Sequence, residues 1–477
     1  MRDLERPLIV WFRRDLRVAD NPALQAAVAT GLPVIPLYIL DDARGPWALG
    51  GASRWWLHES LRALGADVAK LGAPLILRRG AAAAVLDAVI RETQASGVYW
   101  NRCYDPHAMA RDKAVKSKLQ KAGVAAESFN GTLLFEPWEM KTKTGTPFKV
   151  FTPFCRTALK APPPRPPLPA PKILRAPKSL PASEPLASWA LQPVKPDWAT
   201  DLRATWTPGE TAALTSLDTF RDNAVSDYIA NRDVPGITGT SRLSPYLAFG
   251  EISAHQVWHR AARWEQGGGV TGFMRQIIWR EFSAHLLYNF PHLPDRPLRE
   301  NFAAFPWRRD TDTLEAWRRG LTGYPIVDAG MRELWHTGWM HNRVRMVAAS
   351  FLVKHLLLPW RAGEDWFWDT LVDADLANNA ANWQWVAGCG TDAAPYFRVF
   401  NPVLQGEKFD SDGAYVRCWV PELAALPNSF LHKPWELPEA QLQAAGIVLG
   451  KTYPVPIVDH KTARTRALIA FSQMRAD

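Results

Sequence analysis

The chain has 477 residues, roughly three domains of about 150 residues each, so its length excludes a single small binding module. Its hydrophobic and charged fractions, 47% and 22%, are those of a globular protein rather than a disordered or fibrous one. A formal net charge of +9 and an isoelectric point of about 9.4 favour a polyanionic partner over a cationic one.

Cysteine usage and the apolar runs indicate the compartment. Cys103, Cys155, Cys389 and Cys418 lie far apart, which favours a reducing compartment and excludes a Cys-x-x-Cys zinc site. No apolar run reaches the roughly 18 residues of a membrane span, and the charged start Met1–Arg6 is not that of a secretory signal. We therefore expect a cytoplasmic protein with no membrane partner and no metal site.

Residues 8–130 alternate short apolar runs with amphipathic stretches. The apolar runs predict strands at 7–12, 34–40, 74–77, 98–101 and 125–129. The stretches between them predict helices, one entered at Asn21–Pro22 and three others near 53–64, 82–95 and 107–121. This alternation predicts a doubly wound parallel five-stranded α/β sheet. Because no G-x-G-x-x-G follows the first strand, we do not expect a Rossmann-type dinucleotide site there.

A proline-rich segment follows. Residues 161–196 contain 12 prolines, five basic residues and one acid, a composition that favours polyproline II over helix or interior strand. We expect an α/β domain at 1–130, a solvated linker at 131–200 and a second domain at 201–477. In the second domain, apolar residues at three and four spacing predict an all-α fold, most clearly at 271–289, 328–337 and 343–357.

Two kinds of feature in the second half carry chemistry. The stretch Pro235–Tyr246 gathers glycines, hydroxyls and an arginine before a helix, for which we expect Ser244 to be the N-cap and Pro245 the first residue. Its N-terminus could bind a diphosphate, but taken alone the pattern favours a plain helix cap. The windows Gly338–Met346 and Asp373–Trp385 concentrate charges, amides and tryptophans; an Arg345–Asp373 ion pair between two helices is the purely structural explanation.

The ordered motifs resemble those of the photolyase/cryptochrome family over nearly the whole chain. Besides the segments just named, they comprise Trp11–Arg17 (WFRRDLR), Trp279–Phe282 (WREF) and Thr322–Ala329 (TGYPIVDA). The resemblance implies an α/β antenna domain joined to a helical FAD-binding domain. It also gives the 23 tryptophans functions beyond core filling, namely stacking on bases and relaying electrons.

The resemblance implies roles for individual residues. FAD would be held by Tyr228, Thr240, Ser241, Arg242, Leu243, Ser244, Arg280, Asn342, Arg345, Asp373, Asp375 and Asn379. Asn379 would face flavin N5, and the catalytic residues around a flipped-out lesion would be Trp279, Gln276, Asn342, Met346 and Trp385. Trp279 and Trp385 would also contact DNA, together with Arg232 and Arg343. Trp383, Trp360 and Trp307 would form the electron relay.

The implied activity is light-driven splitting of cyclobutane pyrimidine dimers in UV-damaged DNA, by a monomeric carbon–carbon lyase. Gln276 is typical of six-four photolyases, whereas Met346 matches the cyclobutane enzymes and, as a thioether, has no proton to donate. A cryptochrome-type photoreceptor is the other alternative. His107–Ala108 stand where some folate-using relatives carry Asn-Glu, so methenyltetrahydrofolate held differently, a deazaflavin and an empty antenna site all stay open.

Overall fold

The computed structural model describes residues 6–41, 47–392 and 397–476, so most of the charged start lies outside the described residues. The chain forms two compact units, each assembled from segments distant in sequence. The first comprises Met1–Asp222, Ser241–Pro291 and Val372–Leu376. The second comprises Asn223–Thr240, His292–Leu371 and Ala377–Asp477. The domain boundaries at residues 130 and 200 stay predictions.

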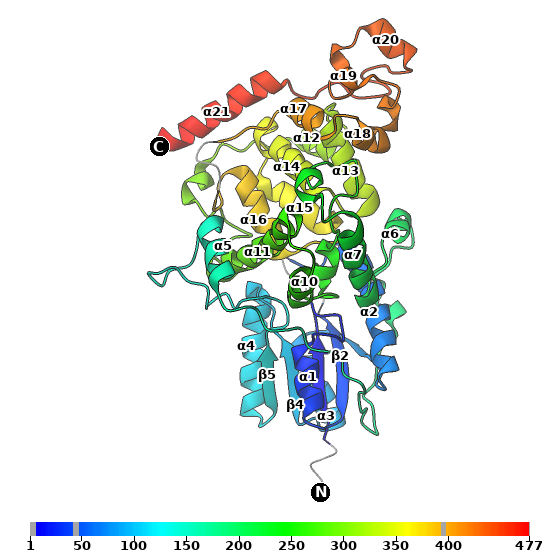
Figure 1. The fold of residues 1–477 in the computed structure, drawn as a ribbon, viewed down its shortest axis with the longest axis vertical. Helices are drawn as coiled ribbons and strands as arrows, with labels where there is room; N and C mark the ends of the chain where they lie inside the picture. Colours follow the sequence, from blue (N-terminus) through cyan, green and yellow to red (C-terminus); the bar gives the residue numbers. More distant parts are fainter. Residues whose placement is uncertain (1–5, 42–46, 393–396, 477) are drawn as a thin grey trace. The chain divides into compact units, whose positions relative to one another are not determined.

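The first unit contains the predicted sheet, whose strands are blue to cyan in Figure 1. The strands are parallel and lie in the order β3-β2-β1-β4-β5, which confirms the doubly wound five-stranded sheet. Their bounds are β1 (Leu8–Phe12), β2 (Val34–Leu40), β3 (Ile76–Arg79), β4 (Gly97–Asn101) and β5 (Ala125–Phe129). The helices between them are α1 (Pro22–Ala29), α2 (Gly51–Lys70), α3 (Ala82–Thr93) and α4 (Pro106–Lys121).

The alternation of side chains along β1 explains how one face of this sheet is buried. Ile9 and Trp11 share a core cluster with Leu86 of α3 and Leu119 of α4, because alternate residues of a strand point to the same face. Gly97 of β4 allows the close pairing beside β1, since a Cβ there would lie 2.8 Å from the Leu8 side chain. A parallel sheet buried on both faces requires such apolar strands.

The motif Trp11–Arg17 has a structural role in the first unit. The guanidinium of Arg17 is buried and donates to the carbonyl oxygens of Gly250 at 2.8 Å and of Gly131 at 2.6 Å. It also donates to the carbonyl oxygen of Asp20 at 2.6 Å. One side chain therefore joins the end of β1 to two loops that are distant in sequence, and each buried N–H gains an acceptor.

The proline-rich segment 161–196 is irregular apart from the 3-10 helix η2 (Leu186–Trp189), and it is anchored to the first unit. Leu174 N donates to Leu71 O at 2.6 Å, and Glu184 N donates to Leu77 O at 2.9 Å. Trp189 is buried and packs against Tyr38 of β2. As predicted, this segment contains no α-helix. The expectation that it is a solvated linker is wrong at these anchored positions.

A helix that the sequence analysis missed, α5 (Phe151–Lys160), precedes this segment. Its buried residues include Phe151 and Phe154, and its only proline, Pro153, lies in the first turn, where a missing N–H costs little. The prolines just downstream dominate the local composition, so the apolar periodicity of α5 was not detected in the sequence. This helix packs against α11 (Gly268–Asn289), which carries several of the predicted site residues.

The described residues after 200 form helices, with one isolated bridge pair at Leu449 and Tyr453, as the periodicity predicted. The predicted helix 343–357 is divided into α14 and the π-helical turn η4. None of the described helices has the length and apolar character of a membrane span. Their bounds are α6 (Thr200–Thr205), α7 (Glu210–Asn223), α8 (Tyr228–Asn231), α9 (Ser244–Phe249), α10 (Ala254–Ala261), α11 (Gly268–Asn289), η3 (Glu300–Ala304), α12 (Thr311–Arg318), α13 (Pro325–Thr337), α14 (Asn342–Ser350), η4 (Phe351–His355), α15 (Trp360–Thr370), α16 (Leu376–Ala387), α17 (Pro402–Phe409), α18 (Ala414–Trp419), η5 (Pro421–Leu423), α19 (Asn428–Leu431), η6 (Pro434–Glu436), α20 (Glu439–Ala444) and α21 (His460–Ala476).

Candidate active site

In the first unit, α11 carries Gln276, Trp279 and Arg280. The half-buried indole of Trp279 stacks flat on the ring of Phe151, with centroids 3.5 Å apart and an interplanar angle of 7°. Gln276 donates through Nε2 to the carbonyl oxygen of Gly272 at 3.2 Å within the same helix. The sequence analysis named Trp279 and missed Phe151, although an aromatic residue at the start of an amphipathic segment could have pointed to it.

The loop after β5 fixes the position of α11. The buried carboxylate of Glu281 accepts hydrogen bonds from Leu134 N at 2.8 Å and Phe135 N at 3.2 Å. Burial raises the pKa of Glu281 to about 7, against the opposing effects of Arg280 and these backbone donors. Arg280 donates to Thr132 O at 3.1 Å. These bonds hold the helical turn that presents Trp279.

Predicted diphosphate contacts also belong to the first unit. Ser241 O accepts from the hydroxyl of Ser216 at 3.0 Å, and Arg242 lies over the ring of Trp206. Arg242 has a φ of +50°, a strained conformation for a residue with a side chain. The expected N-cap at Ser244 is wrong: α9 begins at Ser244, and Leu243 occupies the cap position without a side-chain hydrogen bond. The positive φ of Arg242 turns the chain into α9, and no serine side chain caps the helix.

In the second unit, His341 positions the first turn of α14. Its Nδ1 accepts from Arg343 N at 3.2 Å and so caps the helix. Its own backbone N–H donates to Glu333 at 3.1 Å, and Tyr415 donates to the same carboxylate oxygen at 2.6 Å. Burial lowers the pKa of His341 to about 4, so the imidazole is neutral near pH 7 and can accept the capping bond.

Two predicted catalytic residues lie together on α14. Asn342 and Met346 are four residues apart, and the Asn342 amide nitrogen lies 3.9 Å from the Met346 sulfur. Arg345 of the same helix donates from Nε to Met340 O at 2.7 Å. Helical spacing therefore brings an amide and a thioether onto one face of α14.

The two arginines predicted to contact DNA meet at one carboxylate. Arg343 Nη2 lies 2.7 Å from Asp233, and Arg232 Nε lies 3.9 Å from the other oxygen of that side chain. Arg232 also lies over the ring of Tyr228, a predicted FAD contact. Asp233, which the sequence analysis missed, partly neutralises both cations.

The hydrogen bond from Asn379 fixes the orientation of its side-chain amide. Asn379 Nδ2 donates to the backbone carbonyl of Glu364 at 3.0 Å, so the amide oxygen points to the opposite side. The Glu364 carboxyl is fully buried, and neither oxygen has a hydrogen-bond partner among the described residues. Burial raises the pKa of Glu364 well above its usual range, because removal from water disfavours the charged carboxylate.

The predicted relay tryptophans lie on neighbouring segments of the second unit. The buried ring of Trp383 packs against Gly363 in α15, where a Cβ would lie 2.1 Å from the indole. Trp360 begins that helix, one turn earlier. Arg308 N donates to Leu357 O at 2.8 Å and so joins the segment of half-buried Trp307 to the turn before Trp360. Trp385, predicted to contact the lesion rather than to relay electrons, is half-buried and donates to Asp392 O at 3.0 Å.

The predicted FAD contacts are divided between the two units. Asp373 and Asp375 belong to the first unit and Arg345 to the second, so the Arg345–Asp373 ion pair stays a prediction. Across the described ranges, no cluster of three or more His, Cys, Asp or Glu side chains is arranged to hold a metal ion.

Comparison with known proteins gives concordant results for both halves of the chain. A family model for the FAD binding domain of DNA photolyase matches residues 273–473, and a DNA photolyase model matches residues 8–172. The deoxyribodipyrimidine photo-lyase of Agrobacterium fabrum is 55% identical, over 98% of each chain. Cryptochrome-1 of Arabidopsis thaliana is 44% identical, over 98% of this chain and 70% of that protein. A crystal structure of a bacterial class III photolyase from Agrobacterium tumefaciens superposes with a TM-score of 0.96 at 54% identity, covering 99% of this chain and 98% of the other.

Proposed function

Because the chain belongs to the DNA photolyase and cryptochrome family, we propose that it is a deoxyribodipyrimidine photo-lyase. Its reaction is the light-driven splitting of cyclobutane pyrimidine dimers in UV-damaged DNA, with FAD as the catalytic cofactor. The Agrobacterium fabrum photo-lyase is 55% identical over 98% of this chain, more than cryptochrome-1 of Arabidopsis thaliana at 44%. The observation that carries the proposal is the orientation of Asn379.

The Asn379 amide suits a reduced flavin. Because its nitrogen is bonded to Glu364 O, its oxygen is the atom available to a ligand, and an oxygen accepts a hydrogen bond from an N–H. Reduced flavin carries a proton on N5, whereas the oxidised ring has a bare acceptor there. When bound and reduced, FAD supplies one electron to the dimer upon light absorption and regains it after the ring splits. The amide oxygen of Asn379 therefore favours reduced flavin, the redox state that repair requires.

The surroundings of Asn379 fit a flavin in a second respect. Burial of Glu364 raises the pKa of its carboxyl and so disfavours a negative charge near a reduced, anionic ring. Arg345, fixed by Met340 O, supplies a positive charge from α14. We propose that Tyr228, Thr240, Ser241, Arg242, Leu243, Ser244, Arg280, Asn342, Arg345, Asp373, Asp375 and Asn379 hold the cofactor.

We propose that Trp279 and Trp385 stack on the flipped-out lesion. Stacking on an aromatic side chain stabilises a bound base by about 1–3 kcal/mol, which offsets part of the cost of unstacking. Phe151 holds the Trp279 ring flat and keeps it from turning into the core. Asn342, Gln276 and Met346 complete the set of residues around the lesion. Because a thioether donates no proton, Met346 favours cyclobutane over six-four repair.

The remaining proposals concern DNA binding, the electron relay, the cellular compartment and the antenna chromophore. Arg232 and Arg343 contact backbone phosphates, and Trp383, Trp360 and Trp307 bring electrons to oxidised flavin. The protein acts as a cytoplasmic monomer, and its four free cysteines support a reducing compartment. An antenna chromophore, methenyltetrahydrofolate or a deazaflavin, would extend its absorption.

The test uses FAD-loaded protein reduced with dithionite. It is illuminated with two oligonucleotides in separate reactions, one carrying a cyclobutane dimer and the other a six-four product. We expect reversal of the cyclobutane dimer alone, measured as recovery of a restriction site at the lesion. Reversal of the six-four product alone would show that the protein is a six-four photolyase. If fully FAD-loaded protein repairs neither lesion, the result would favour a photoreceptor.

A further inference from the structure

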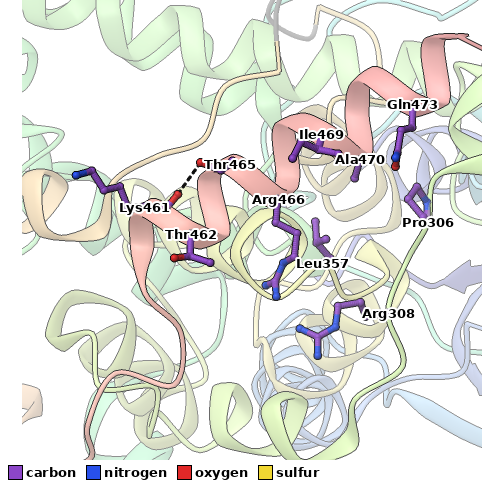
Figure 2. A pocket seen from close by; sticks show the side chains of 10 residues that line it. All are labelled: Pro306, Arg308, Leu357, Lys461, Thr462, Thr465, Arg466, Ile469, Ala470 and Gln473. Carbon is purple, nitrogen blue, oxygen red and sulfur yellow. Dashed lines mark hydrogen bonds between the residues drawn. The ribbon is translucent and has the colours of Figure 1, made fainter.

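A groove in the second unit runs beneath α21, and none of its lining residues has a role in the proposed reaction (Figure 2). It has a volume of about 690 Å³, within the range of sites that hold small molecules. Its lining residues are Pro306, Arg308, Leu357, Lys461, Thr462, Thr465, Arg466, Ile469, Ala470 and Gln473.

The groove is cationic. Arg308, Lys461 and Arg466 line it, and none of the ten described lining residues is acidic. In Figure 2 the side chain of Arg466 descends from α21 into the groove, and that of Arg308 extends from the opposite wall into the same region. Two guanidinium groups therefore face one open groove.

The partners of these two arginines leave positive charge in the groove. Arg466 Nη2 donates to His355 O at 2.5 Å, a neutral acceptor, and its buried Nε has no hydrogen-bond partner among the described residues. Arg308 lies 3.3 Å from Asp310, and its side chain is 44% exposed. Arg308 therefore has a carboxylate partner, whereas the hydrogen-bond acceptor of Arg466 is a neutral carbonyl. Burial, together with the positive charge of Arg308, lowers the pKa of Arg466.

An anion would relieve this repulsion. Like charges held together in a partly desolvated place are unfavourable unless an opposite charge bridges them. The planar guanidinium fork matches the geometry of phosphate oxygens and binds them through paired hydrogen bonds. The hydroxyls of Thr462 and Thr465 line the same groove but already donate to Asp459 and to Lys461 O, so the cationic side chains are the donors left for a phosphate.

The apolar wall distinguishes a small ligand from a nucleic-acid backbone. Pro306, Leu357, Ile469 and Ala470 line the groove, and Ile469 is 51% exposed. A phosphate backbone would contact the cations but gain nothing from this apolar wall, whereas a ring attached to a phosphate would cover it. We propose that the groove binds a small phosphorylated molecule of nucleotide size, with its phosphates between Arg308 and Arg466 and its ring against Ile469.

Binding would also tie α21 to the segment it covers. Arg466 already holds His355 O, and the backbone N–H of Arg308 holds Leu357 O. A phosphate bridging the two side chains would close a chain of bonds from α21 to the 306–308 segment. We therefore expect the occupied groove to slow amide hydrogen exchange in residues 460–476.

The test titrates the full-length, FAD-loaded protein with ADP and with pyrophosphate, measured by calorimetry. FAD loading keeps ADP out of the flavin site. We expect one ADP per chain, weaker binding of pyrophosphate and no binding of adenosine, which lacks phosphate. Arg308→Gln should weaken ADP about tenfold or more, since it removes a charge-assisted hydrogen bond. Arg464→Gln is the matched control, because Arg464 is an exposed cation on the same helix that does not line the groove.

Three results would overturn the proposal. The first is no ADP binding by the parental protein. The second is an equal loss in Arg308→Gln and Arg464→Gln, which would indicate general electrostatic attraction. The third is displacement of ADP by an undamaged oligonucleotide whose own binding is weakened in Arg308→Gln, which would assign the groove to nucleic acid. Retained flavin absorbance and an unchanged melting temperature verify that Arg308→Gln is folded.

Discussion

The rings of Phe151 and Trp279 lie face to face, with centroids 3.5 Å apart and planes 7° from parallel. Phe151 is buried, and Arg275 lies over its ring at 5.2 Å. Because one face of the Trp279 indole is covered, a base can stack only on the opposite face. The missed helix α5 thus supports the residue from which we expect recognition of the lesion.

Replacing Phe151 should therefore change recognition of damage more than affinity for DNA in general. Phe151→Leu keeps apolar volume but loses the flat surface, and aromatic pairs contribute about 0.5–1.5 kcal/mol beyond burial. We expect about 2- to 10-fold weaker binding of dimer-containing DNA, with intact duplex unchanged, measured by fluorescence anisotropy. Phe154→Leu is the control, because Phe154 packs on Phe282 and His285 in the same core. Equal effects of the two variants on lesion binding would contradict the supporting role of Phe151.

Removing the charge of Asp233 should strengthen DNA binding. Its carboxylate lies 2.7 Å from Arg343 and 3.9 Å from Arg232, so it competes with phosphates for both cations. In Asp233→Asn we expect tighter binding of intact and damaged DNA alike, and a steeper decrease in affinity with salt. Arg343→Gln should act in the opposite direction, with a shallower salt dependence. The measurement is a salt titration of DNA affinity, and unchanged affinity in both variants would show that this surface does not contact phosphates.

The folded protein should lose stability in acid partly through His341. Burial lowers its folded-state pKa to about 4 from 6.5, so the unfolded chain binds the proton first as the pH falls. This contribution to stability is complete above pH 6.5 and is lost as the pH falls through 6.5 toward 4. Between pH 7.5 and 5 the loss is about 2 kcal/mol.

The variant His341→Asn keeps a side-chain acceptor at the cap and removes the titration. Its unfolding free energy, from urea denaturation at both pH values, should therefore fall less than that of the parental protein. His336→Asn, at an exposed position in the last turn of α13, serves as control and should retain the parental pH dependence. If the unfolding free energy falls by the same amount in all three proteins, His341 does not cause the loss of stability in acid.

The sheet could be predicted from the sequence because buried parallel strands are short apolar runs whose spacing survives in the sequence. Its details could not: β3 begins at Ile76 rather than Pro74, since only pairing with β2 sets its ends. Helix α5 was missed because the prolines that follow it dominate the local composition. For the site, motifs identified the residue types, but the orientation of Asn379 depends on a carbonyl 15 residues away in sequence, and only the folded chain supplies that acceptor.

Trp383 gives the sharpest test of the proposed relay. Its ring is 2% exposed and packs against Gly363, with edge contacts to Phe367 and Trp317 at centroid distances of 5.0 and 6.3 Å. Phenylalanine keeps most of this packing but is much harder to oxidise, so Trp383→Phe should fold with a small loss of stability. We expect it to block light-driven reduction of oxidised FAD, followed by absorbance during illumination with a reductant.

Repair by dithionite-reduced Trp383→Phe should be nearly intact, because the repair electron passes from flavin to lesion and does not cross Trp383. Trp317→Phe is the matched control: Trp317 is fully buried, touches Trp383 and donates to Ala348 O, yet it belongs to no step of the proposed relay. It should therefore photoreduce at the parental rate. If Trp383→Phe also photoreduces at that rate, electrons reach the flavin by another route, and the assignment of Trp383, Trp360 and Trp307 as the principal relay is wrong.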